Sequence, residues 1–139
     1  MSTDYDAVEP KRSTEREAID DDSITDLLSI LQNDRRRVVL DELAFIGHDD
    51  WLTLDELTDR LAACEFGRPP AQITSAERKR VYVSLYQTHV PRLADVGLIE
   101  TRDRKTELRL TVAGHAAHRL LPHARTTADA VAELRGESA

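Results

Sequence analysis

The fold of this chain is decided by the stretch Thr88-His89-Val90-Pro91-Arg92-Leu93-Ala94-Asp95-Val96-Gly97-Leu98-Ile99. The stretch predicts the last turns of a helix, a stop at Gly97 and an apolar strand that starts at once. Glycine is favoured just past a helix end because it adopts the left-handed conformation at little cost. A second short apolar run follows after four charged residues, so the pattern predicts a helix that leads directly into a β-hairpin.

Apolar residues at helical spacing predict further helices before this junction. A first short helix is capped by Ser23, and a second is capped by Asn33 or Asp34 and closed by Gly47. Trp51 and Leu52 form a short predicted strand, and Thr53 opens a third helix with a T-x-x-E capping box.

A loop is expected at residues 65–74, which hold a glycine and two prolines. The fourth helix spans about 75–95, and Pro91 should kink its last turn because proline lacks a backbone donor. The hairpin covers 98–110 with a charged tip at 102–105, and Thr111 caps a last helix that Pro122 should stop.

Length and composition favour one compact domain. At 139 residues, 40% of them hydrophobic, the chain predicts a domain at 23–121 between a disordered acidic arm at 1–22 and an Ala-rich tail at 122–139. The tail is expected to be a short helix or a dimerisation element. The only cysteine, Cys64, excludes an internal disulfide framework. Without an apolar run of membrane length or a signal-like start, a cytoplasmic location is expected.

The charge is acidic overall but unevenly distributed. A net charge of −7 argues against a nucleic-acid partner, yet residues 75–110 hold eight Lys and Arg against five Asp and Glu. Only Lys11, Lys79 and Lys105 are lysines. Acid excess with scarce lysine resembles the proteins of salt-loving archaea, which implies a halophilic archaeal source; the alternative is an acidic protein of a mesophile. In molar salt, DNA affinity would rest on close contacts and not on long-range attraction.

Two family resemblances are carried by these segments. Residues 88–99 resemble the S-x-H-L-x-x-L-x-x-x-G-L-V signature of metal- and small-molecule-responsive winged-helix repressors. Across 23–121 the chain is similar to an uncharacterised winged helix-turn-helix family of haloarchaea, chiefly in Leu27–Leu43, Leu54–Leu61 and Tyr82–Ile99. The resemblance implies a mainly α (α+β) fold in which helix 75–95 enters a DNA major groove and hairpin 98–110 acts as the wing.

Candidate DNA contacts follow from this placement. Arginine and glutamine are the side chains that read guanine and adenine in the major groove. The candidates on the helix are Lys79, Arg80, Ser84, Gln87, Thr88 and Arg92, and those on the wing are Arg102, Arg104, Lys105 and Arg109. The alternative for the helix is an ordinary solvated face, and for the wing a charged tip that serves solubility.

The other arginine, aromatic, histidine and cysteine residues are interpreted as parts of the fold and not as sites for a ligand. At least one of Arg35, Arg36 and Arg37 should pair with an acid such as Asp34 or Asp41, because three consecutive helical residues cannot share one face. His89, Tyr82 and Tyr86 are expected in the core or an interface, and Trp51 as a plug on the first strand. Cys64 is interpreted as a small buried hydrophobic residue, with redox sensing as the alternative. The histidines at 115, 118 and 123 lack the acids or thiols that would complete a metal site.

No catalytic motif is present, so the sequence predicts neither an enzyme nor a cofactor. The predicted function is a DNA-binding transcriptional regulator that acts on double-stranded DNA as a homodimer, away from membranes. The alternative is a protein-interaction module built on the same scaffold. A contiguous patch of Arg80, Arg102, Arg104 and Lys105 would favour DNA, whereas interruption by Glu100, Asp103 and Glu107 would favour the interaction module. The sequence leaves open whether a small effector is sensed.

Overall fold

The computed structural model describes residues 22–47 and 49–136. A helix covers residues 22–31, followed by α2 (Asp34–Phe45), β1 (Leu52–Thr53) and α3 (Leu54–Phe66). After the 3-10 turn η1 (Pro70–Gln72) come α4 (Ser75–Ser84), the π-helical turn η2 (Leu85–His89) and α5 (Val90–Asp95). The strands β2 (Ile99–Arg102) and β3 (Glu107–Leu110) precede the last helix, α6 (Val112–Leu134). The predicted arm at 1–22 lies outside the described residues except for Asp22.

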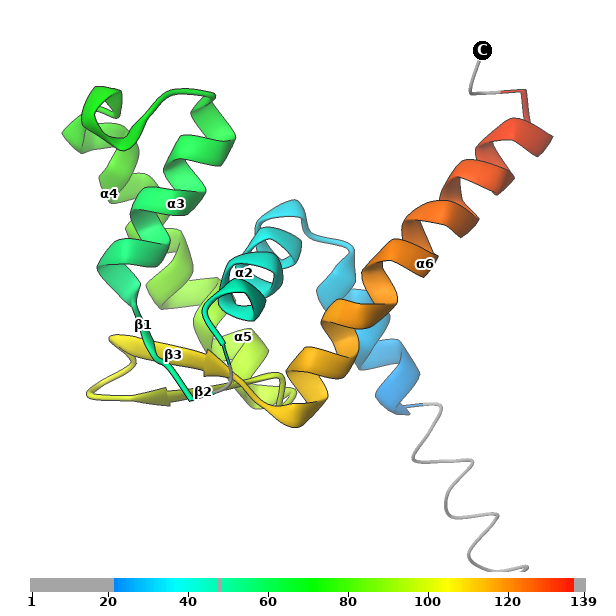
Figure 1. Ribbon diagram of the computed structural model, residues 1–139, viewed down its shortest axis with the longest axis horizontal. Helices are drawn as coiled ribbons and strands as arrows, with labels where there is room; N and C mark the ends of the chain where they lie inside the picture. Colours follow the sequence, from blue (N-terminus) through cyan, green and yellow to red (C-terminus); the bar gives the residue numbers. More distant parts are fainter. Residues whose placement is uncertain (1–21, 48, 137–139) are drawn as a thin grey trace, which may run out of the picture.

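The predicted fold class is confirmed: the structure is mainly helical, with a three-stranded antiparallel sheet in the order β1-β3-β2. The hairpin pairs Ile99 with Leu110 and Arg102 with Glu107, and β1 adds Leu52 opposite Leu108. This arrangement of helices and hairpin is compatible with a winged helix. Figure 1 shows α2 in the middle, α3 and α4 together on one side of it, and α6 on the other.

Local sequence signals explain where the helices begin and end. The side chain of Asn33 accepts a hydrogen bond from the amide of Arg36 at 3.2 Å, so Asn33 is the N-cap of α2. Thr53 and Thr111 cap α3 and α6 in the same way, as predicted. Gly97 has a φ of 83° where α5 gives way to the hairpin, which confirms the helix stop.

The core lies where these elements meet. Side chains from every helix and from the three strands contribute, and the largest fully buried ones include Ile30, Leu40, Leu57, Leu85, Leu93, Leu108 and Leu121. None of the helices in the described ranges has both the length and the apolar character needed to cross a membrane.

Three local predictions were wrong. Residue 22 is already helical, so Ser23 is not the N-cap; the preceding run of aspartates offers equally good caps, and the pattern alone does not choose among them. The third helix continues to Phe66, and the left-handed Gly67 ends it. The last helix continues through Pro122 to Leu134, because the surrounding alanines are strong helix formers. Figure 1 shows this second half of α6 projecting from the body.

Candidate nucleic-acid interface

The outward side of α4 and η2 carries most of the predicted helix contacts. An open, shallow hollow on this side is lined by Ala76, Lys79, Arg80, Val83, Ser84, Gln87 and Thr88. Lys79, Arg80, Gln87 and Thr88 are exposed and Ser84 is half-buried. Five of the predicted contact residues therefore lie together on one surface.

The opposite side of the same helix fixes its position. Val81 and Leu85 are fully buried. Thr74 and Glu77 form a reciprocal capping box at the start of α4, and Arg68 also contacts the Glu77 carboxylate. Arg78 pairs with Asp59 at 2.7 Å and Asp55 at 3.3 Å, which ties α4 to α3. Glu77 is thus occupied with the fold and does not belong to the open face.

A π-helical turn interrupts this helix just before Pro91. The amide of Val90 donates to the carbonyl of Leu85, five residues back, instead of four. Proline has no amide to offer Gln87, and its ring would crowd that carbonyl in a regular α-helix, so a wider turn relieves both problems. The distortion at Pro91 therefore takes the form of a local widening of the helix, which continues to Asp95.

The tip of the wing is held in an unusual conformation. Asp103, Arg104 and Lys105 have positive φ angles of 52°, 56° and 69°. The hydroxyl of Thr106 stabilises the turn by donating to the carbonyl of Asp103 at 2.6 Å. Left-handed backbone costs roughly 1 kcal/mol or more for each residue with a side chain. The tip therefore presents two adjacent cations from a strained backbone.

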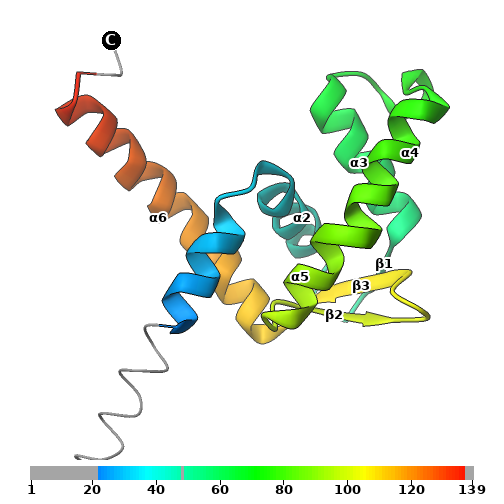
Figure 2. The ribbon, with the colours of Figure 1, turned by 180° about the vertical axis from the view of Figure 1, so that it is seen from behind.

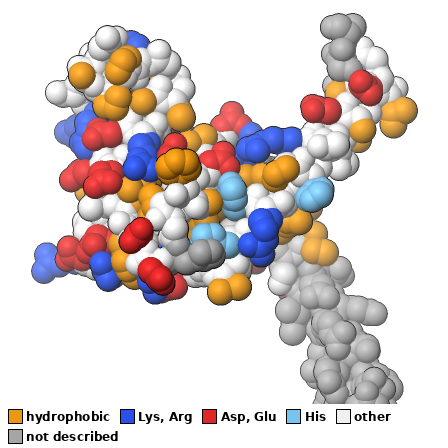
Figure 3. All heavy atoms as spheres, in the orientation of Figure 1, with side chains coloured by type: hydrophobic (Ala, Val, Ile, Leu, Met, Phe, Trp, Pro, Cys, Tyr) orange, Lys and Arg blue, Asp and Glu red, His pale blue; other side chains and the backbone are white. Residues whose placement is uncertain are grey.

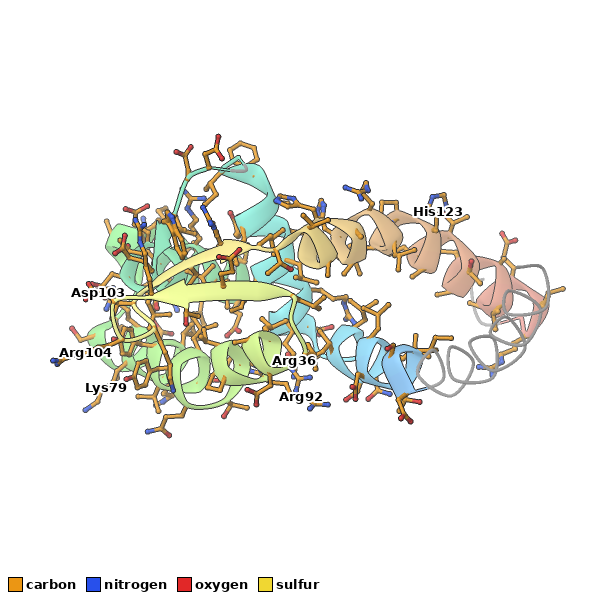
Figure 4. All side chains as sticks on the ribbon, turned by 90° about the horizontal axis from the view of Figure 1, so that it is seen from below. Arg36, Lys79, Arg92, Asp103, Arg104 and His123 are labelled. Carbon is orange, nitrogen blue, oxygen red and sulfur yellow. The ribbon has the colours of Figure 1, made fainter. Side chains whose placement is uncertain are left out.

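The wing tip lies against the helix. The Lys105 ammonium is 5.4 Å from the centre of the Tyr86 ring, and Tyr86 stacks on Tyr82 with ring centres 6.2 Å apart. Figure 4 shows Lys79, Arg104 and Arg92 along the same edge of the molecule, and Figure 2 shows α4, α5 and the β2-β3 hairpin beside one another. We call Lys79, Arg80, Ser84, Gln87, Thr88, Arg104 and Lys105 the helix-wing surface.

Two of the predicted wing contacts lie elsewhere, on the outer face of the sheet. Arg102 and Arg109 both pack on the Trp51 ring, 4.1 and 4.3 Å from its centre. Arg102 also pairs with Glu107 at 3.1 Å, and Arg109 pairs with Glu100 at 3.3 Å. The sequence pattern did not predict this cluster. Alternation along a strand predicts which residues share one face of the sheet. It does not predict which of them are neighbours across strands until the strand register is known.

The predicted basic patch is therefore split by acidic side chains, the arrangement that was expected to favour the interaction module. Arg80, Arg104 and Lys105 belong to the helix-wing surface, whereas Arg102 is tied to Glu107 on the sheet. Asp103 remains exposed at the wing tip between them. Arg92 is half-buried on α5 and donates to the hydroxyl of Ser29 at 3.3 Å.

Ion pairing separates the basic side chains into two groups. Most described arginines contact an acid or another polar group. Within residues 22–47 and 49–136, the basic side chains that make no hydrogen bond, ion pair or ring contact are Lys79, Arg80, Arg104 and Arg119. Three of these four lie on the helix-wing surface. On the opposite face, Figure 3 shows basic and acidic side chains interspersed over α3 and the hairpin.

The arginine run at the start of α2 divides as predicted. Arg37 pairs with Asp34, whereas Arg35 pairs with Glu65 on α3. Arg36 instead donates from Nε to Nδ1 of His89 at 3.3 Å and from Nη1 to the carbonyl of Ser29 at 3.2 Å. His89 is only 5% exposed, which confirms its predicted place in the core.

Acidification is expected to destabilise the fold through His89. Burial lowers the pKa of His89 below its ordinary value of 6.5, and the charges of Arg36 and Arg35 lower it further. The unfolded chain therefore binds a proton at a higher pH than the folded protein does. Stability should be unaffected by this group above about pH 6.5 and should fall as the pH drops from there toward the folded pKa.

The measurement is the urea midpoint of unfolding at several pH values between 8 and 5. A His89→Asn variant should lose the dependence in this window, whereas His123→Asn, at an exposed position on α6, should keep it. An equal pH dependence in wild type and His89→Asn would contradict the assignment.

The structure also describes the surroundings of Cys64 and of the histidines on α6. Cys64 is exposed, so its interpretation as a buried residue was wrong: it lies in the last turn of α3, beyond Leu61 and Ala62, the last residues of this helix that the core buries. His118 contacts Asp41 at 3.0 Å. Among the described residues, no group of three or more potential ligands is arranged to hold a metal ion.

Comparison with known protein families identifies the family of this chain. Residues 28–109 match a domain of unknown function, DUF7344. No curated protein and no solved structure matches the chain. The matched segment covers more than half of the 139 residues and includes α2, the α4 to α5 helix and most of the hairpin, but not α6. The chain belongs to the DUF7344 family.

Proposed function

We propose that this protein is a non-enzymatic regulator of transcription that binds double-stranded DNA through the helix-wing surface. The observation that carries the proposal is the placement of unpaired cations. In a chain with 26 acidic against 19 basic residues, partners for every exposed arginine are abundant. Lys79, Arg80 and Arg104 nevertheless have none among the described residues. Cations without an acid partner are free to bind phosphates.

The shape of the surface supports the same function. A helix in the major groove with an adjacent hairpin on the backbone is a common way for small helical domains to bind DNA. Lys79, Arg80 and Gln87 lie on the solvent side of the helix, where they would reach base edges or phosphates. Arg104 and Lys105 at the wing tip would contact the neighbouring backbone. The similarity of residues 88–99 to winged-helix repressors agrees with this assignment.

The test is the salt dependence of duplex binding, measured by fluorescence anisotropy with random and genomic-fragment DNA from low to molar KCl. Each phosphate that the protein neutralises should contribute about −0.9 to the slope of log K against log salt. Saturable binding with a slope that corresponds to several phosphates supports the proposal. A folded protein that binds no duplex at any salt concentration refutes it.

A protein-interaction module is the second candidate, and the Trp51 cluster favours it. Tryptophan and arginine are enriched among the residues that dominate protein interfaces. Trp51 is half-buried beneath Arg102 and Arg109, whose charges are already balanced by Glu107 and Glu100. This face is suited to a protein and not to phosphates. Binding of a protein partner that is abolished in Trp51→Ala, with no DNA binding by the wild type, would select this function.

We further propose that the protein forms a homodimer through α6 and the helix at residues 22–31. Exposed apolar side chains lie on both helices, with Ile24 54%, Leu28 55%, Leu120 45%, Val131 41% and Leu134 87% exposed. A hollow of about 340 Å³ between the two helices is lined largely by apolar residues, among them Leu27, Leu98 and Leu120. A helix of this length without tertiary packing is marginal in water, so the projecting half of α6 needs a covering partner.

The double variant Leu120→Asp, Val131→Asp is expected to be monomeric. Losing two buried apolar side chains in each copy should weaken association by more than about a hundredfold. Light scattering after gel filtration measures the mass. The control is Phe45→Asp, which also places a charge at an exposed apolar position, 85% exposed, but on α2. A monomeric wild type, or a dimer that survives the double variant, would contradict this interface.

A further inference from the structure

A polar hollow of about 540 Å³ lies where the start of α2 faces the π-helical turn of the long helix. It is lined by Gln32, Asn33, Asp34, Arg35, Glu65 and His89. It is separate from the helix-wing surface, which is lined by other residues. Three elements meet here, because Glu65 comes from α3.

The His89 ring offers this hollow a hydrogen-bond donor. Arginine only donates hydrogen bonds, so the contact from Arg36 Nε makes Nδ1 of His89 an acceptor. The proton of the neutral ring is then on Nε2. No described residue accepts a hydrogen bond from Nε2. Among the described residues, every fully buried side-chain nitrogen or oxygen has a hydrogen-bond partner, so Nε2, which has none, is not fully buried. Since His89 is only 5% exposed and lines the hollow, we infer that Nε2–H opens into it.

The charges around the hollow leave a positive excess. Both acids are neutralised, Asp34 by Arg37 and Glu65 by Arg35. Arg36 is half-buried, but the groups that its guanidinium contacts, His89 and the Ser29 carbonyl, are uncharged. A half-buried cation without a counter-charge favours the binding of an anion nearby.

We propose that this hollow binds a small oxyanion, a carboxylate or a phosphate, which accepts a hydrogen bond from His89 Nε2 and is attracted by Arg36 and Arg35. Glu65 already places a carboxylate on the Arg35 guanidinium in a two-pronged contact, which demonstrates that an oxyanion fits this fork. A bound oxyanion competes with Glu65 for Arg35.

Binding at this site would act on the proposed DNA contacts. His89 belongs to the π-helical turn, and Gln87 and Thr88 are its immediate neighbours in that helix. An anion bound to His89 would therefore contact the same helix that carries the helix-wing surface. This regulatory consequence rests on the proposed function, whereas the binding itself does not.

The experiment follows the His89 ring signals by NMR in the full chain without DNA, at pH 7.5. Sodium acetate and sodium phosphate are titrated separately at constant ionic strength against sodium chloride. A saturable shift of the His89 signals with either anion, absent with chloride alone, is expected, and the two titrations distinguish the carboxylate from the phosphate. Bound anion should also raise the pKa of His89, because it favours the protonated ring.

Two variants should change the affinity for the anion in opposite directions. Glu65→Gln removes the competing carboxylate and should strengthen anion binding several-fold, and it changes only a partly exposed side chain. Arg36→Gln should weaken binding by about tenfold, because it removes one cation that attracts the anion. No saturable shift in either wild type or Glu65→Gln overturns the proposal, as does equal affinity of wild type and Glu65→Gln. Neither result depends on whether the protein binds DNA.

Discussion

Replacing Lys79 and Arg80 together by glutamine is expected to weaken duplex DNA binding by about ten- to a hundredfold at moderate salt. Both side chains are exposed and lack acid partners among the described residues, so the substitution leaves no acid unpaired and should not disturb the fold. The slope of log K against log salt should become shallower by about 0.9 for each phosphate that the variant no longer neutralises. Anisotropy titrations across a KCl series measure both quantities.

Arg119→Gln is the matched control for this double variant. Arg119 is also exposed and has no acid partner in the part of the chain that the structure describes, but it lies on α6, away from the helix-wing surface. It changes the net charge in the same direction, so it separates a local contact from a general charge effect. Because Arg119→Gln removes one positive charge and the double variant removes two, a decrease in log K half as large as that of the double variant would mean that binding depends only on overall charge. An unchanged affinity in the double variant would remove α4 from the interface.

The parts of the fold that could be predicted from the sequence depend on interactions over a few residues. The caps at Asn33, Thr53 and Thr111 each join a side chain to an amide three residues later, and Gly97 ends a helix through its own backbone conformation. The helix-to-hairpin junction combines several such signals, which is why it identified the fold class.

The errors arose where local rules compete. Proline at 122 predicts a helix end, but the strong helix formers on both sides continue the helix past it. Proline at 91 predicts a distortion of the helix, but not its form, which is a widened π-helical turn. The burial of Cys64 was predicted from residue type, but the core buries α3 only as far as Ala62, and Cys64 lies in the exposed last turn.

The candidate site could also be predicted only in part, but the reason differs from that for the helix boundaries. The sequence identified the helix face that carries Lys79, Arg80 and Gln87, because helical periodicity places residues on faces. It did not reveal which cations are neutralised, because pairs such as Arg35 with Glu65 and Arg109 with Glu100 join distant segments. Whether an arginine is available to a ligand depends on the fold, so the division of the predicted wing contacts required the structure.

Gly114→Ala is expected to destabilise the protein by about 3 kcal/mol or more, the upper end of the cost of overpacking. A side chain at this position would collide with the backbone carbonyl of Leu98 and would lie 3.0 Å from Leu110 Cδ2. Backbone cannot move aside as a flexible side chain does. The glycine is therefore what allows the first turn of α6 to cross the start of the hairpin closely, where the hydroxyl of Thr111 donates to the carbonyl of Gly97 at 2.7 Å.

The sign of this effect distinguishes packing from helix propensity. In an exposed helix, changing glycine to alanine stabilises by about 1 kcal/mol, so propensity alone predicts a gain for Gly114→Ala. Ala113→Gly, at the neighbouring exposed position, is the control and should cost about 1 kcal/mol. Urea unfolding of the three proteins measures the free energies. A stabilised Gly114→Ala would mean that α6 does not approach the hairpin as described, and the fixed placement of the wing relative to α6 would no longer hold.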